Sequence, residues 1–418
     1  MRFSSAAAIL ALCLVGSSAW DLDYGLNPDV DLDMDSDDLE AMEPEADMTT
    51  PEVIKHWGYP VETVNVTTQD SYILQLHHIL GGRNENGKSR ARKPVVFMQH
   101  GLQDSSFTWV ANLPNESAGF LFADAGFDVW LGNVRGNTYG RGYTKQDKED
   151  FWDFSWDEMA AIDLPTMVNA VLARTGQKKL TYVGHSQGTL IMFAKLAEDR
   201  EFGSKIDKFF ALAPVSTVAH IEGLASHLSK YPMIHSLAVK FSNNFYQLFA
   251  HLSFVRKLSG KICDFPVVGK FCAKFATFVA GPDASQQMNK TRMGIYASQA
   301  PAGTSAKNMM HWTQMVKSKK MQKYDYGKEE NLNKYKQSEP PCYDVSKITT
   351  ETHLFYSKND WLATYADIKE SIVGKMKRGV VREHLLKEFN HFDFVWGLRA
   401  AEQIYMPIIR MLKRGSGQ

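Results

Sequence analysis

The chain lacks any apolar run long enough to cross a membrane as a helix. No stretch of about 18 apolar residues occurs, which is the length that a spanning helix needs. The apolar segment at residues 6–15 is too short, follows Arg2, and precedes small residues at 17–19, an order typical of a signal peptide. We therefore predict a signal peptide over residues 1–19 and a protein of the secretory pathway, destined for the lysosome lumen or the extracellular fluid.

Cysteine is also scarce, with four in 418 residues. Loss of the predicted signal peptide removes Cys13 and leaves Cys263, Cys272 and Cys342, which suits one disulfide and one leftover thiol in an oxidising compartment. The close pair, Cys263 and Cys272, is the expected disulfide. No Cys or His flanks these residues at metal-ligand spacing and no His-Glu-x-x-His motif occurs, so we predict neither a metal nor a cofactor.

Three Asn-x-Ser/Thr sequences are candidate glycosylation sites, at Asn65, Asn115 and Asn289. Such acceptors lie on the surface of secreted proteins. Each motif is weak by itself, but the three agree with the predicted entry into the secretory pathway.

The formal net charge of the chain is zero, but the charged residues are unevenly distributed along it. Residues 21–47 contain twelve Asp or Glu and no Lys or Arg, whereas the chain from residue 48 onward has 46 basic residues against 35 acidic ones, an excess of 11. Low complexity and high negative charge predict a disordered acidic arm over residues 20–50. The arm is either a solvated tail or a removable pro-segment that screens the basic body.

The body alternates between strand-like and helix-like segments, except in its middle. An alternation of this kind predicts an α/β fold with a mostly parallel central sheet flanked by helices. The alternation lapses over residues 216–340, which are helix-like and aromatic, so this region is interpreted as an insertion between two core parts, 51–215 and 341–418. The expected strands are a hairpin at 61–79 and single strands at 94–99, 127–134, 179–184, 209–214, 352–357 and 382–389.

One predicted helix carries its own start and stop signals. Ser155 and Glu158 have the spacing of a capping box, and Gly176 suits the C-terminal end. Pro165 falls between them and is expected to kink the helix or to begin a new one.

The sequence Gly-His-Ser-Gln-Gly at residues 184–188 joins a strand-like segment to a helix-like one. This is the context of a nucleophile elbow, in which a serine is held on a strained turn. Gly184 and Gly188 let the strand and the helix approach closely, and the helix N-terminus favours developing negative charge. The motif predicts Ser186 as a nucleophile.

A nucleophilic serine needs a base, and the base needs an orienting carboxylate. In this architecture the chain order is serine, acid, histidine. Asp360 follows one predicted strand and His391 follows the last one, so they are the predicted acid and base. Asp393 and Asp367 are the rival acids, but Asp393 is close to His391 in sequence and Asp367 lies in a helix-like run.

An oxyanion site requires two preorganised N–H donors. Gln187, directly after the nucleophile, is expected to supply one of them. The second is expected from the loop after the strand at 94–99, where we choose the N–H of Leu102.

Taken together, these residues closely resemble the acid lipase family of the α/β-hydrolase fold, which includes gastric and lysosomal acid lipases. The resemblance runs from about Pro51 to near the C-terminus. It rests on HGL at 100–102, NVRGNTYGR at 133–141, FWDFSWDEMAAIDLP at 151–165, GHSQGT at 184–189, SKND at 357–360 and NHFDF at 390–394.

The resemblance implies hydrolysis of triacylglycerols and sterol esters, often at acidic pH, beneath an inserted cap and lid. It places a catalytic triad at Ser186, Asp360 and His391, oxyanion donors at Leu102 and Gln187, and a lid-region disulfide between Cys263 and Cys272. The departures are a longer acidic arm, Val134 where a serine is usual, and Cys342 in place of a cysteine nearer the disulfide.

Residues 228–280 of the insertion are basic and rich in Phe and Tyr, with one acidic residue against seven basic ones. This composition suits contact with an anionic lipid surface. It suits equally a helical cap whose aromatic residues form its core and whose basic face is solvated. Two other functions compete with a lipase on the same fold, a non-catalytic lipid carrier and a serine peptidase. The intact triad argues against the carrier, and the aromatic insertion favours lipid over peptide.

Overall fold

The structure is a computed structural model that describes residues 44–85, 93–146, 149–224, 226, 260, 262–263 and 266–415. All of these residues belong to one compact unit, Met42–Gln418. The predicted signal peptide, the acidic arm up to residue 43, and residues 227–259 of the insertion lie outside the described residues.

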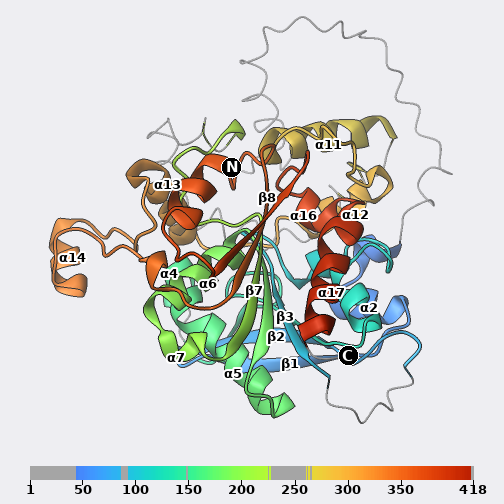
Figure 1. Ribbon diagram of the computed structural model, residues 1–418, viewed down its shortest axis with the longest axis horizontal. Coiled ribbons are helices and arrows are strands. Elements are labelled where there is room, and N and C mark those ends of the chain that lie inside the picture. The colour runs from blue at the N-terminus through green and yellow to red at the C-terminus, as the bar shows by residue number, and fades with distance from the viewer. Residues whose placement is uncertain are drawn as a thin grey trace, which may run out of the picture. The chain divides into compact units, whose positions relative to one another are not determined.

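A nine-stranded sheet forms the centre of this unit (Figure 1). Its order is β1-β2-β4-β3-β6-β7-β8-β9, and β5 pairs with β2. Pairing is parallel from β4 through β3 to β9 and antiparallel where β2 meets β1, β4 and β5. The mostly parallel sheet is confirmed. The strands are β1 (Val61–Thr67), β2 (Tyr72–Ile79), β3 (Val95–Gln99), β4 (Asp128–Gly132), β5 (Gly142–Tyr143), β6 (Leu180–His185), β7 (Ile206–Leu212), β8 (Thr352–Ser357) and β9 (Val381–Leu386).

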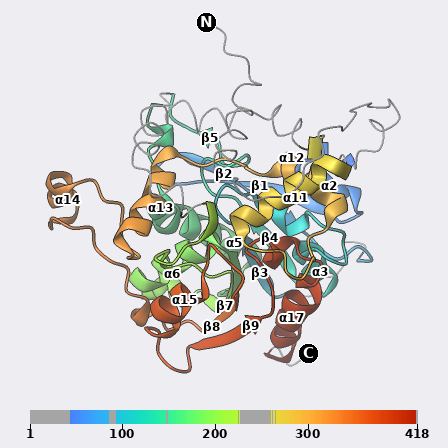
Figure 2. The same ribbon diagram turned by 90° about the horizontal axis from the view of Figure 1, so that it is seen from above.

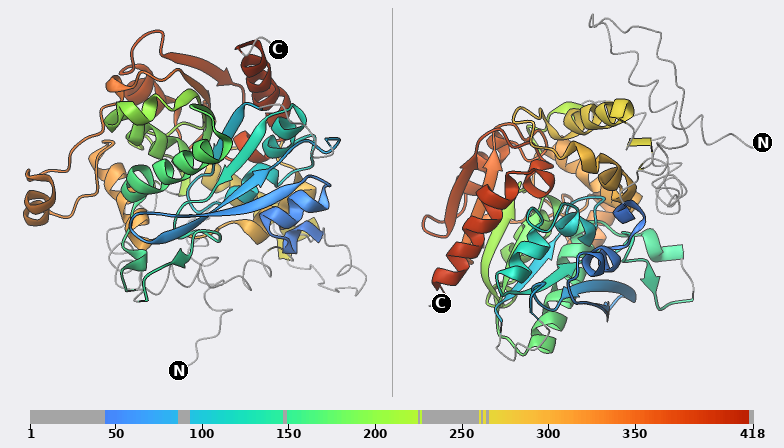
Figure 3. Two further views of the ribbon diagram at one scale, coloured as in Figure 1. Left: turned by 90° about the horizontal axis from the view of Figure 1, so that it is seen from below. Right: turned by 90° about the vertical axis from the view of Figure 1, so that its right-hand side faces the viewer.

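Helices cover both faces of the sheet, which explains its continuous apolar strands. Every residue of β3, β6 and β8 is buried, as expected for strands packed on both sides. Figure 1 shows α5 and α6 on one side of the sheet and α17 on the other, Figure 2 shows α3 near α17, and Figure 3 gives two further views. The core helices are α2 (Thr50–His56), α3 (Ala118–Asp124), α4 (Trp156–Glu158), α5 (Leu164–Thr175), α6 (Gln187–Glu198), α7 (Arg200–Gly203), α15 (Tyr365–Ile368), α16 (Asp393–Trp396) and α17 (Met406–Gly415).

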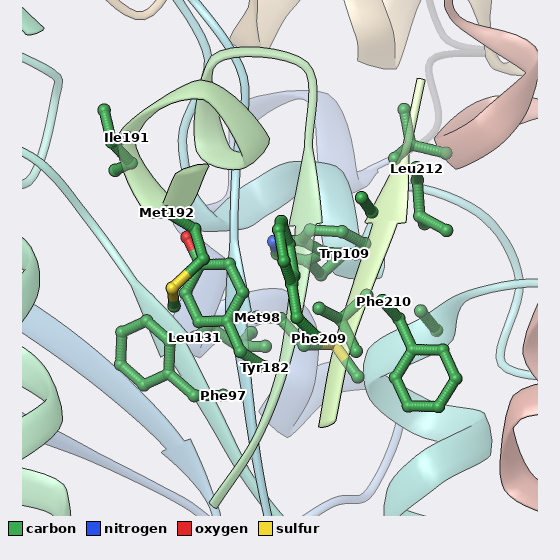
Figure 4. Close-up of a cluster of buried hydrophobic side chains, with 14 of the residues drawn as sticks. Phe97, Met98, Trp109, Leu131, Tyr182, Ile191, Met192, Phe209, Phe210 and Leu212 are labelled. Carbon is green, nitrogen blue, oxygen red and sulfur yellow. The ribbon is translucent and has the colours of Figure 1, made fainter. Parts of the chain in front are cut away.

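The core beneath the site is built from large side chains of the central strands. Figure 4 shows Phe97, Tyr182 and Phe209 among this buried cluster, and all three are fully buried. Phe97 stacks on Tyr182, and Phe209 meets Tyr182 edge-on. Close packing of this kind makes the strand ends a rigid platform for the loops that follow them.

The local helix signals are confirmed, with one refinement. Ser155 caps α4 and its N–H donates to the carboxylate of Glu158 at 2.6 Å. A π-helical segment over Met159–Asp163 then leads into α5, where Pro165 occupies the second position. Gly176 ends α5 with a φ of 64°, a conformation that glycine adopts without strain. The backbone stays helical from Trp156 to Thr175, so Pro165 lies within one continuous helical run, just after its π-helical segment.

The inserted region, called the cap below, joins β7 to β8. Its described helices are α11 (Pro266–Ala280), α12 (Met293–Gln299), α13 (Ala306–Ser318) and α14 (Lys328–Tyr335), and α14 stands away from the others in Figures 1 and 2. Cys263 and Cys272 form the predicted disulfide at the start of α11. Cys342 is a free, exposed cysteine.

The prediction that the acidic arm extends to residue 50 is wrong for its last residues. Residues 44–47 form a 3-10 turn in which Glu45 is 1% exposed. The Glu45 carboxylate accepts two hydrogen bonds from Arg292, at 2.9 and 3.0 Å, and one from the Trp57 indole at 2.5 Å. A bidentate guanidinium and an indole N–H compensate the burial of this charge, which composition alone could not reveal.

Replacing Glu45 with alanine is expected to lower the free energy of unfolding by about 3–5 kcal/mol, because Arg292 would remain buried without its counterion. Urea denaturation measures the change. Glu329→Ala, at an exposed position on α14, is the control and is expected to stay within about 0.5 kcal/mol of the wild type. Equal stabilities of the Glu45→Ala variant and the control would contradict the prediction.

Candidate active site

Ser186 occupies a sharp turn between β6 and α6. Its φ of 52° and ψ of −118° are strained for a residue with a side chain, as in a nucleophile elbow. The Ser186 N–H donates to Leu212 O at 3.1 Å, and its carbonyl accepts from Thr189 Oγ1 at 2.6 Å. A Cβ at Gly188 would lie 2.4 Å from Gln99 O, so only glycine allows α6 to approach the end of β3.

The structure brings Ser186, His391 and Asp360 together in one hydrogen-bonded chain. Ser186 Oγ lies 2.8 Å from His391 Nε2. His391 Nδ1 lies 2.9 and 3.0 Å from the two carboxylate oxygens of Asp360. All three side chains are buried, with Ser186 at 7% exposed. Low local dielectric strengthens such a chain of hydrogen bonds.

Neighbouring groups fix the orientation of the acid and the base. Asp360 Oδ1 accepts the N–H groups of Leu362 and Ala363, at 2.9 and 2.8 Å. The backbone of His391 is held on both sides, because its N–H donates to Ala280 O at 3.1 Å and its carbonyl accepts from His185 Nε2 at 3.0 Å. Burial lowers the pKa of His185 well below its usual value, so this neighbour adds no positive charge.

Both rival acids lie elsewhere in the hydrogen-bond network. Asp367 accepts from Thr217 Oγ1 at 2.7 Å and from two backbone N–H groups just beyond it. Asp393 accepts the Asn390 N–H at 2.8 Å. Within the described residues, neither carboxylate contacts the imidazole of His391, so Asp360 is the acid that the geometry favours.

Asp393 is nevertheless an unusual group, because it is fully buried and its Oδ1 has no hydrogen-bond partner among the described residues. Burial raises the pKa of its carboxyl to about 7, and the nearby carboxylates of Asp283 and Asp360 act in the same direction. The Asn390 N–H and Arg399 oppose the shift but do not cancel it.

The Asp393→Asn variant is expected to gain stability relative to the wild type as pH rises. The native pKa lies above the ordinary 3.8, so the stability that protonation supplies is present at low pH and is lost as pH rises through about 7. The ionised form then carries a native-state penalty of about 4 kcal/mol, which an amide avoids.

Thermal unfolding at pH 5 and pH 8 tests this. The Tm of Asp393→Asn minus that of the wild type should be several degrees higher at pH 8. Asp207→Asn, at an exposed position, provides the control. A difference in Tm that does not change with pH would contradict the prediction.

Of the two predicted oxyanion residues, Gln187 is adjacent to the serine and Leu102 follows Gly101, which lies close to it. Gln187 lies at the N-terminus of α6, and Leu102 lies in the turn after β3. A Cβ at Gly101 would lie 3.1 Å from Ser186 Cβ, which shows how closely this turn approaches the nucleophile. Asn137 braces the turn, since its amide donates to Asp104 O at 3.3 Å and lies 3.1 Å from His100 Nε2.

Sequence reasoning missed the cap residues that touch this machinery. Gln187 Oε1 accepts from Asn308 Nδ2 at 2.9 Å and from Trp312 Nε1 at 2.8 Å, both on α13. Ala280, the last residue of α11, provides the carbonyl that holds His391. These positions lie more than 100 residues from their partners along the chain, and no motif in the cap points to them.

The other predicted sites are placed as follows. Asn65 and Asn115 are exposed, and Asn289 is half-buried with its side chain accepting from Thr291. Among the described residues, no group of three or more His, Cys, Asp or Glu could hold a metal ion. A search of the described helices finds none long and apolar enough to cross a membrane.

Comparisons with known proteins agree with this geometry. Residues 50–113 match the family described as a partial alpha/beta-hydrolase lipase region, and residues 94–398 match the alpha/beta hydrolase fold. "Lipase lipl-1" of Caenorhabditis elegans is 44% identical over 89% of this chain and 93% of its own length. The human "Lysosomal acid lipase/cholesteryl ester hydrolase" is 38% identical over 90% of this chain and 93% of its own length.

A solved structure from Sulfolobus solfataricus is similar in fold. It has a TM-score of 0.50 and 15% identity, and the similarity covers 85% of this chain and 99% of that one. The sequence relatives show the family as well as the fold. Each is identical to this chain at more than a third of the aligned positions, and each alignment covers about nine-tenths of the chain. The chain is an ester hydrolase that belongs to the lipase family of the α/β-hydrolase fold.

Proposed function

We propose that the enzyme hydrolyses fatty-acyl esters of neutral lipids, triacylglycerols and sterol esters, through an acyl-enzyme on Ser186. The observation that carries this proposal is the hydrogen-bonded chain from Asp360 through His391 to Ser186, with links of 2.9 and 2.8 Å. The human relative's name, cholesteryl ester hydrolase, supports the choice of substrate class.

The proposed reaction has two acyl-transfer steps. Ser186 Oγ attacks the ester carbonyl while His391 Nε2 takes its proton and then delivers it to the departing alcohol. Water, deprotonated by the same imidazole, then attacks the acyl-enzyme and releases the fatty acid. Asp360 keeps the imidazole in the required tautomer and stabilises the imidazolium that forms in each step.

The N–H groups of Leu102 and Gln187 are proposed to bind the oxyanion of both tetrahedral intermediates. The N-terminus of α6 adds its positive end at the same place. Each donor in such a site typically contributes about 10²–10³ in kcat, so the two together outweigh any single ground-state contact in the pocket.

Fatty-acid release from emulsified triolein and cholesteryl oleate, at pH 5 and pH 7, tests the proposal. We expect release from both lipids, faster at pH 5, and complete inactivation by an alkyl phosphonate that labels Ser186 in a one-to-one ratio. Cleavage of only soluble short-chain esters would show that the enzyme is an esterase and not a lipase. Lipid binding without hydrolysis would favour the alternative, a non-catalytic lipid carrier, and cleavage of peptides would favour a serine peptidase.

We also propose that α11 contacts the lipid–water interface. The helix turns its small residues Ala273 and Ala276 toward the core and exposes three phenylalanines spaced along one face. Lys270 and Lys274 are exposed beside them. An exposed apolar face flanked by Lys is typical of helices that lie on an anionic lipid surface. The three are Phe271, Phe275 and Phe278, at 57%, 62% and 45% exposed.

The double variant Phe271→Ser/Phe275→Ser is expected to bind phosphatidylserine-containing vesicles at least about tenfold more weakly, because each buried Phe contributes about 1.5–3 kcal/mol. Vesicle sedimentation measures the change. Leu332→Ser removes another exposed apolar side chain, from α14, and is the control. Unchanged vesicle binding by the double variant would contradict the proposal that α11 contacts the lipid surface. Two further basic residues of the segment 228–280, Lys257 and Lys261, lie outside the described residues.

We propose that the protein enters the secretory pathway, is lysosomal or secreted, and carries glycans on Asn65, Asn115 and Asn289. We also propose that the cap extends from residue 216 to residue 340, between the two parts of the core. The exposed positions of Asn65 and Asn115 support the proposed glycosylation. Mass spectrometry of protein recovered from eukaryotic cells would show the mature N-terminus and the glycans, and unmodified asparagines would contradict it.

A further inference from the structure

We propose that the segment from Ala302 to Trp312 of the cap positions both donors of the oxyanion site, and that Asn308 and Trp312 are positioning residues for Gln187. The inference rests on the proposed function, since it assigns the Gln187 N–H a part in catalysis. It adds a role for the cap beyond covering the site, because the cap would complete the geometry of the core's catalytic groups.

The contact with Gln187 is made by two donors that converge on one oxygen. Asn308 Nδ2 and Trp312 Nε1 lie 2.9 and 2.8 Å from Gln187 Oε1. An indole N–H can only donate, so the carbonyl oxygen of the Gln187 amide must face α13. The other end of the amide, Nε2, lies 3.4 Å from Met159 Sδ. The side chain of Gln187 is therefore held at both ends.

Asn308 is itself fixed at the N-terminus of α13. Its side chain is fully buried, and its Nδ2 also donates to Thr304 Oγ1 at 2.9 Å. Its backbone N–H donates to Ser305 Oγ, the N-cap of the helix, at 2.9 Å. Because two hydrogen bonds fix Asn308 to the residues that begin α13, any shift of α13 would be passed on to Gln187.

The same segment holds the other half of the oxyanion site. Gln103, the residue after Leu102, accepts the Ala302 N–H at 2.6 Å through its carbonyl. Gln103 Nε2 also lies 3.3 Å from Met309 Sδ, one residue beyond Asn308. Two loops of the core, after β3 and β6, are thus tied to one eleven-residue stretch of the cap.

This arrangement has a specific kinetic consequence. Oxyanion donors act on charge that develops in the transition state, and they act by being preorganised. If the Gln187 N–H loses its support, the transition state is stabilised less while the bound ester is nearly unaffected. Loss of the hydrogen bonds from Asn308 and Trp312 to Gln187, called the clamp below, should therefore lower kcat and leave KM unchanged. Loss of a residue that merely lines the pocket would change KM.

The test uses Trp312→Phe, which removes the indole N–H and keeps an aromatic ring, and Asn308→Ala. With p-nitrophenyl butyrate as substrate, we expect kcat to fall about tenfold or more for each variant at constant KM. The Ki of an alkyl trifluoromethyl ketone, which forms a tetrahedral adduct with serine, should rise by the same factor. Gln314→Leu, whose side chain faces Asp325 on the exposed side of α13, is the matched control.

A double-mutant cycle separates positioning from general disruption. Gln187→Met keeps the backbone N–H but lacks the accepting oxygen, so Trp312→Phe should have little further effect on kcat in that background. Additive losses in kcat, or a changed KM at constant kcat, would overturn the inference. Trp312→Phe remains decisive if Asn308→Ala fails to fold. Absence of hydrolysis by the wild type would overturn the proposed function as well, whereas an active wild type with unaffected Trp312→Phe would overturn the clamp alone.

Discussion

Replacing Ser186 with alanine is expected to lower kcat for ester hydrolysis by about five to six orders of magnitude. The only hydroxyl in contact with His391 Nε2 within the described residues would be lost, and water would be a poorly placed substitute. The remaining rate would come from the oxyanion donors and substrate binding, which typically retain about 10³–10⁴ over the uncatalysed reaction. Alanine accepts the elbow conformation about as well as serine, so folding should be preserved.

The measurement is the initial rate of fatty-acid release from triolein, with thermal unfolding as the check on folding. Ser216→Ala is the matched control, because Ser216 is a buried serine near the end of β7 that bonds to Ser371. The control should keep at least a tenth of the wild-type rate. If Ser186→Ala retained more than about one per cent of the rate while folded, Ser186 would not be the nucleophile.

The parts of this site that sequence could predict are those with local signatures. The elbow needs two glycines and a serine between a strand and a helix, and all of these requirements fall within a dozen residues. Asp360 and His391 could be located because parallel strands present their C-terminal ends at one edge of the sheet. In the structure β6, β7, β8 and β9 are consecutive neighbours, so the loops after β6, β8 and β9 meet there.

The parts that sequence could not predict depend on contacts between distant segments. The burial of Glu45 requires Arg292, nearly 250 residues away, and without that partner an acidic residue in an acidic arm is expected to be solvated. The hydrogen bonds from Asn308 and Trp312 to Gln187 likewise join the cap to the elbow across more than 120 residues. Their side chains have no periodicity that distinguishes them from ordinary residues of an amphipathic helix.

The position of the cap in the topology explains why it can act on the whole site. It leaves the sheet at the C-terminal end of β7, between the strand that carries the serine and the strand that precedes the acid. From there α13 reaches Gln187, and the end of α11 reaches the backbone of His391 through Ala280. The helix that we propose to contact lipid and the helix that holds Gln187 are therefore both attached to loops of the proposed catalytic triad and oxyanion site.

Replacing Asp360 with asparagine is expected to lower kcat by about 10⁴, although the change is nearly isosteric. The reason lies in the two backbone N–H groups, of Leu362 and Ala363, that donate to Asp360 Oδ1. They require the carbonyl oxygen of the new amide at that position, which turns its NH₂ group toward His391 Nδ1. Nδ1 must then accept, so the imidazole proton moves to Nε2.

An imidazole with its proton on Nε2 cannot take the proton of Ser186, and the base is lost while every side chain stays in place. Rates of triolein hydrolysis give kcat, and ¹⁵N shifts of the His391 ring report the tautomer directly. Asp367→Asn is the matched control, since Asp367 is buried and accepts backbone N–H groups but does not contact His391. The control should change stability more than kcat. A variant of Asp360 that kept a tenth of the wild-type kcat would show that another group orients His391, and Asp393, whose Oδ1 has no hydrogen-bond partner among the described residues, would be the first to examine.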